Sequence, residues 1–199
     1  MPEFADNLFG FSPMGEEETE LIPLLSNEEE DMMNQEKIPD VLPILSLRNT
    51  VLFPGVVIPI TVGRDKSIHL IKDVNKGDKI VGVVSQKDDK QEDPAFEDLN
   101  PVGTVAVVLK MLRMPDGNTT VIIQGKRRFI MQEMVQQEPY FKARVTAFPD
   151  LQPEKGNKEF EALVASLKET SLNIIQNSPN IPSEAGFAIK NIESPSFLI

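Results

Sequence analysis

The clearest pattern in this sequence is a series of short apolar runs between about residues 41 and 150, separated by turn-forming residues. The runs are rich in valine and isoleucine and predict β-strands. Their bounds are 41–47, 56–62, 79–86, 103–114, 119–124, 129–135 and 141–148. Pro59 lies inside the second run and has no N–H to donate to a neighbouring strand, so we expect an edge strand or a bulge there.

Residues 103–114 form the longest run, and alternate positions are apolar on both of its faces, interrupted by Lys110. A strand that is apolar on both faces must be covered on both. The run therefore predicts a closed barrel, or a sheet packed against another element. The turn signal Pro115–Asn118 joins it to the next run as a hairpin.

Two segments between the predicted strands depart from the β pattern. Residues 64–75 predict a short helix closed by Gly77, because apolar residues recur there at helical spacing, at Ile68, Ile71 and Val74. Residues 87–100 are polar and acidic, which predicts a surface loop.

Beyond about residue 157 the apolar period becomes helical. One helix is predicted to end before Ser178, with a shared face made of Phe160, Leu163, Val164, Leu167, Ile174 and Ile175. A second helix is expected within residues 183–192, and Ser194 followed by Pro195 is typical of the start of a third. The last three residues are apolar, so we expect a fragment that continues into a helical bundle.

The predicted class is therefore α+β, with three parts. These are an acidic tail over residues 1–40, a β-rich domain over 41–150 and the start of a helical subdomain over 151–199. The net charge of −11 belongs to the tail, which has 12 acidic residues and one basic residue, Lys37; the remaining body is neutral. Like charges and prolines predict that the tail is disordered. Apolar residues between its acids leave open that it docks onto a partner.

The composition excludes several kinds of chemistry. With no cysteine, the chain has no disulfide, cysteine-ligated zinc or catalytic thiol. The single histidine, His69, is interpreted as structural or surface-exposed rather than as a catalytic base, and no phosphate-binding loop occurs. A neutral body argues against nucleic acid as a partner. No membrane span or secretory signal is evident, so we expect a cytoplasmic protein without a membrane partner.

Two groups of residues allow a binding interpretation. Lys126, Arg127 and Arg128 form the only basic triplet, which indicates either contact with an anion or acidic peptide, or simply a solvated strand end. Methionines gather around the predicted hairpin, and methionine adapts to irregular apolar partners. They favour either core packing or a surface for unfolded polypeptides; the set is Met111, Met114, Met131 and Met134, with Leu112 among them.

Several blocks of the sequence, in order, resemble the N-terminal domain of Lon, the ATP-dependent bacterial protease. They are Leu42–Gly55, Pro59–Ile68, Val102–Ala106, Leu112–Gly117 and Gly125–Phe129. The resemblance covers about residues 40–199, and the acidic tail falls outside the family pattern. It implies a six-stranded, PUA-like, mainly antiparallel β-barrel followed by an α-helical subdomain; cereblon is similar in its β-domain.

The resemblance also implies a function. The Lon N-domain recognises misfolded or degron-bearing proteins and helps to assemble a homohexamer. The family's ATPase module, with its ATP and magnesium, and its Ser–Lys protease dyad lie farther along the chain, so this stretch should have neither catalytic residues nor a cofactor. Candidate substrate contacts are Arg64, Lys66, His69, Met111, Leu112 and Met114. The alternative is a PUA-like ligand- or RNA-binding module with no link to proteolysis.

Overall fold

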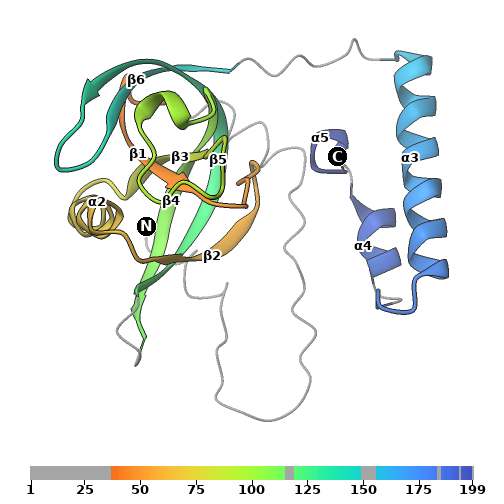
Figure 1. Ribbon diagram of the computed structural model, residues 1–199. Helices are drawn as coiled ribbons and strands as arrows, with labels where there is room; N and C mark the ends of the chain where they lie inside the picture. Colours follow the sequence, from red (N-terminus) through yellow and green to blue (C-terminus); the bar gives the residue numbers. More distant parts are fainter. Residues whose placement is uncertain (1–36, 115–118, 149–155, 183–184, 193, 199) are drawn as a thin grey trace, which may run out of the picture.

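The computed structural model describes residues 37–114, 119–148, 156–182, 185–192 and 194–198. Six strands form one sheet in the order β2-β5-β4-β3-β1-β6 (Figure 1). Their bounds are β1 Val41–Leu47, β2 Val57–Val62, β3 Ile80–Ser85, β4 Val102–Arg113, β5 Thr119–Gln136 and β6 Lys142–Ala147. The predicted acidic tail up to residue 36 and the predicted turn at 115–118 lie outside the described residues.

The sheet closes into a barrel because β5 is long enough to serve two neighbours on one edge. Its first part pairs with β2 and its last part pairs with β6, while β4 lies along the other edge. Only the β1–β3 pair is parallel among the described strands. The expectation of a mainly antiparallel barrel in an α+β chain is confirmed.

The strand β5 also corrects the sequence prediction, which had placed two separate strands at 119–124 and 129–135. The structure joins them through Gly125 and the basic triplet that follows it. The pairing of β4 with β5 shifts register twice, between Thr104 and Ala106 and again between Val108 and Lys110. Such bulges let one long strand bend around the barrel.

Both faces of the sheet are covered, as the apolar run in β4 predicted. One cluster of buried residues contains Ala106 and Val108, and the other contains Val105 and Phe129. The far half of β4 differs from the prediction, because it reaches past the core: Leu109 and Met111 are exposed, and Leu112 is half-buried.

Helix α2, Asp65–Lys76, follows β2 directly. It buries Leu70, Ile71 and Val74 against the first cluster and ends where Gly77 N–H donates to Val74 O at 3.1 Å. Full burial of a large apolar side chain contributes about 1.5–3 kcal/mol, so these three anchor the helix to the barrel. The predicted helix and its terminating glycine are confirmed.

The segment predicted as a plain surface loop at 87–100 has structure of its own. It contains the 3₁₀ helix η1, Phe96–Asp98, and the buried Leu99, whose main chain bridges to Gln86. Most of the segment is exposed, as predicted, but the prediction missed Phe96 and Leu99, two apolar residues among many acidic ones. These two residues anchor the segment to the second cluster, where Phe96 lies edge-on to Phe141.

Three helices follow the barrel in the sequence. They are α3 Lys158–Asn177, α4 Ala185–Asn191 and α5 Pro195–Leu198 (Figure 1). The Asn157 side chain caps α3 by accepting from Phe160 N–H at 3.1 Å, and Lys168 Nζ donates to Ile192 O at 2.6 Å. None of the described helices is long and apolar enough to cross a membrane. Half of the apolar face predicted for α3 is exposed, at Leu163, Leu167 and Ile174, and α3 has no buried residue.

Candidate functional site

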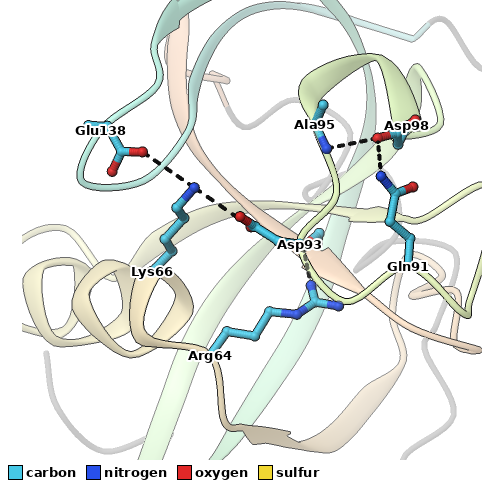
Figure 2. A network of polar contacts seen from close by, with 8 residues as sticks. Arg64, Lys66, Gln91, Asp93, Ala95, Asp98 and Glu138 are labelled. Atoms are coloured by element: carbon cyan, nitrogen blue, oxygen red, sulfur yellow. Dashed lines mark hydrogen bonds and ion pairs between the residues drawn. The ribbon is translucent and has the colours of Figure 1, made fainter.

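The start of α2 is tied to two distant parts of the chain by a polar network (Figure 2). Lys66 Nζ lies 3.6 Å from Asp93 Oδ1 and 3.3 Å from Glu138 Oε1. It also lies 5.8 Å from the centre of the Phe141 ring. Lys66 therefore joins α2 to the loop after β3 and to the β5–β6 connection. Exposed ion pairs of this kind contribute little to stability individually.

Arg64 is the residue before α2, and its guanidinium donates hydrogen bonds to two neutral groups. Nη1 donates to Ser46 Oγ at 3.0 Å and Nη2 donates to Gln86 Oε1 at 2.6 Å. Within the described chain it forms no ion pair. Burial lowers the pKa of Arg64, and the nearby charge of Arg48 lowers it further, while Asp93 and Glu92 act in the opposite direction. Its positive charge is only partly offset.

Several polar groups of the acidic loop after β3 form hydrogen bonds within the loop itself (Figure 2). Asp98 Oδ2 accepts from Ala95 N–H at 2.8 Å and from Gln91 Nε2 at 2.6 Å. Gln91 O in turn accepts from Gln86 Nε2 at 2.9 Å and from the Arg48 guanidinium at 3.0 Å. No group of three or more potential metal-ligating side chains occurs in the part of the chain that the structure describes.

Beside Arg64 lies an open groove of about 550 Å³ between β1 and β2. Its lining includes Leu45, Leu47, Ile60 and Val62, which are buried residues of the first core cluster. This groove was not predicted from the sequence, because its walls are two consecutive strands, β1 and β2, that do not pair with each other in the sheet. The one local signal was Pro59, which marks the free edge of β2.

The predicted contact residues at and just before the start of α2 have different surroundings. Arg64 and Lys66 lie in the same polar network, whereas His69 is exposed on the surface of the helix. A second polar contact ties the middle of the helix to the barrel, because Tyr140 Oη donates to Asp73 Oδ2 at 3.2 Å. Burial raises the pKa of Tyr140, and the Asp73 carboxylate raises it further.

The predicted hairpin residues lie at the end of β4. Met111 and Met114 are 39% and 43% exposed, and Leu112 is half-buried. Core packing was therefore the wrong interpretation for these two methionines and for Met134, which is 40% exposed, but it is right for the buried Met131. Strand pairing relates the hairpin to the groove, because Thr119 pairs with Val62 on one side and with the end of β4 on the other.

The basic triplet lies apart from these residues. Lys126, Arg127 and Arg128 are in the middle of β5, so the interpretation as a strand end was wrong. The Arg128 guanidinium lies 5.3 Å from the centre of the Phe148 ring, and Arg128 pairs with Thr104 of β4. Contact of the triplet with an acidic peptide stays a prediction.

Comparisons with known proteins agree on one family. The family described as ATP-dependent protease La (LON) substrate-binding domain matches residues 41–199. A Lon protease of Flavobacterium johnsoniae is 59% identical over 182 residues, which are 92% of this chain and 22% of that protein. A Lon protease of Cytophaga hutchinsonii is 53% identical over the same shares. The chain thus spans about a fifth of the length of these relatives.

Solved structures show the same fold. The N-terminal domain of Mycobacterium avium complex Lon protease matches with a TM-score of 0.64 and 22% identity, over 79% of this chain and 78% of that one. A Lon N-terminal domain protein from Xanthomonas campestris matches with a TM-score of 0.51 and 19% identity, over 79% and 94%. The barrel, the sequence identity and the matched range lead to one conclusion: the chain belongs to the family of Lon substrate-binding domains.

Proposed function

We propose that this chain recognises protein substrates for a Lon protease by binding exposed apolar segments of misfolded or degron-bearing proteins. The observation that carries the proposal is the exposed apolar end of β4, on the same barrel as the open groove beside β2. Unfolded chains present apolar side chains that folded proteins bury, and a flexible methionine surface can adapt to many of them.

The wider setting is part of the same proposal. The rest of the chain would supply the ATPase module, with its ATP and magnesium, and the Ser–Lys dyad, while this domain contributes no catalytic residue. A cytoplasmic homohexamer would present six such domains. Weak capture by one domain then becomes firm capture by several, because linked sites raise the effective concentration of the substrate.

Binding of fluorescently labelled casein, an unfolded polypeptide, tests the proposal. The combined change of Met111, Leu112 and Met114 to Ser should weaken binding about tenfold, which corresponds to about 1.4 kcal/mol. The matched control changes Met134 and Val135 to Ser, since these are 40% and 51% exposed but lie at the other end of β5. Equal losses in both variants, or no loss in either, would refute this surface as the site.

The alternative of a ligand- or RNA-binding module gains no support from the matches described above, which are all to Lon proteins. A low-salt titration with single-stranded RNA still provides a direct check. We expect no tight, salt-sensitive binding of RNA, because the body has no net positive charge.

A further inference from the structure

Strand β2 has one edge without a strand neighbour among the described residues. Gly125 N–H donates to Val56 O at 2.9 Å, which fixes the side on which β2 faces β5. Main-chain groups of successive residues alternate between the two edges of a strand, so Val57, Pro59 and Thr61 point to the other edge. That edge offers two N–H donors and three C=O acceptors, because Pro59 has no N–H.

The opposite wall of the groove is also a strand edge. Strand β1 pairs with β6 over Val41–Pro43 and with β3 over Ile44–Leu47. Gln86 N–H donates to Leu47 O at 2.9 Å, so Leu47 faces β3 and Ser46 faces the groove side. Strands β1 and β2 are not neighbours in the sheet. The groove therefore lies between two strand edges, over a floor of core side chains.

One end of this groove is positively charged. Arg48 and Arg64 both line it. The hydrogen-bond partners of Arg64 in the described chain are the neutral Ser46 and Gln86, which use two of its five N–H donors. A carboxylate is the group that best matches the free donors of a guanidinium.

We propose that the groove binds an extended segment of the substrate as an added strand along β2, with a carboxylate side chain of that segment held by Arg64 and Arg48. This inference rests on the proposed function and specifies how the substrate is bound. Main-chain hydrogen bonds to a strand edge do not depend on sequence, as suits a protein that binds many unfolded chains. The two arginines add a preference for acidic segments.

The strand-addition step is tested by changing one N–H donor at a time. The probe is a fluorescent eight-residue peptide of alternating Val and Thr with one central Glu, titrated into the full 199-residue chain. Pro59→Ala adds a donor to the free edge and should tighten binding about three- to tenfold; Thr61→Pro removes one and should weaken it by a similar factor. If neither change alters the affinity by more than twofold, strand addition is wrong.

The carboxylate contact is tested with a second peptide in which Gln replaces Glu. We expect the wild-type chain to prefer the Glu peptide about tenfold or more, and Arg64→Gln to abolish that preference. Arg144→Gln is the control, since Arg144 is exposed on β6 and already paired with Glu133 at 2.8 Å. Equal binding of both peptides by the wild type would overturn the contact.

Two further measurements separate the remaining outcomes. If the chain binds casein but neither peptide, the groove assignment fails and the proposed function stands; if casein does not bind either, the proposed function itself fails. In the full chain with the acids at 16–18 and 28–31 changed to their amides, peptide affinity should stay within twofold. A tenfold rise would identify the acidic tail as the occupant and overturn the assignment to substrate.

Discussion

Gly125 in β5 is the position where a single methyl group should do most harm to the groove. A Cβ there would lie 2.2 Å from Phe53 O and 3.0 Å from Phe53 C. An ordinary carbon–oxygen contact is about 3.3–3.6 Å, so the backbone of the segment leading into β2 would have to move by about 1 Å. Both contacts are with main-chain atoms, and no side-chain rotation can relieve them.

The expected cost of Gly125→Ala follows from what that movement disturbs. Overpacking costs about 1–3 kcal/mol. The hydrogen bonds from Gly55 N–H to Gly125 O and from Gly125 N–H to Val56 O, both 2.9 Å, contribute about 0.5–1.5 kcal/mol each. Alanine also lowers the conformational entropy of the unfolded chain, which offsets about 0.4–1 kcal/mol of this loss. We therefore expect a loss of about 2–5 kcal/mol, a large part of the 5–15 kcal/mol typical of domains.

Urea unfolding followed by far-ultraviolet circular dichroism measures this loss, since the chain has no tryptophan. The control is Gly63→Ala, because a Cβ at Gly63 meets no atom within 4 Å. It should change the free energy of unfolding by less than about 0.5 kcal/mol. A Gly125→Ala variant as stable as this control would refute the argument that the close approach of Phe53 positions β2.

Two other changes test the core and the pH dependence. Phe129→Ala removes a side chain with 0% exposure and should cost about 3–5 kcal/mol in urea unfolding, whereas Phe53→Ala, at 59% exposure, should cost under about 1 kcal/mol; similar costs would contradict the assigned burial. The raised pKa of Tyr140 means that the folded state holds the phenol proton more tightly than the unfolded state does. The contribution of Tyr140 to the free energy of unfolding is therefore complete below about pH 10, and it is lost as the pH rises through the folded pKa. In Tyr140→Phe, unfolding between pH 8 and 11 should therefore show a shallower loss of stability, and an unchanged slope would contradict the contact with Asp73.

The strands were predictable wherever side chains alternate regularly. The runs at 41–47 and 141–148 match β1 and β6 closely, and Pro59 marked the edge strand. The prediction failed at the centre of β5, where a glycine and three basic residues interrupt the apolar pattern. Those basic residues are half-buried or exposed, so the strand continues without a hydrophobic signal. The glycine is required there by the approach of Phe53, a contact that no local pattern reveals.

The candidate site was less predictable, because its contacts join residues far apart in sequence. Arg64 and Lys66 were chosen as exposed charges on a helix. In the structure, Arg64 donates hydrogen bonds to Ser46 and Gln86, which are 18 and 22 residues away in the sequence. Lys66 forms an ion pair with the distant Glu138. The groove is made by two strand edges that are not paired with each other. Which strands pair depends on how the whole barrel closes, and the apolar pattern of a single strand does not reveal this.

A neutral body does not imply a neutral groove. In the loop after β3, Asp98 is used by Ala95 N–H and Gln91, and Asp93 pairs with Lys66. Of the two carboxylates that raise the pKa of Arg64, Asp93 and Glu92, Asp93 pairs with Lys66, and the hydrogen-bond partners of Arg64 are neutral. Positive charge therefore persists at one end of the groove, although acidic and basic residues balance over the domain. Specificity then has two layers: a strand edge that accepts any extended backbone, and an arginine pair that favours acidic segments without requiring a fixed sequence.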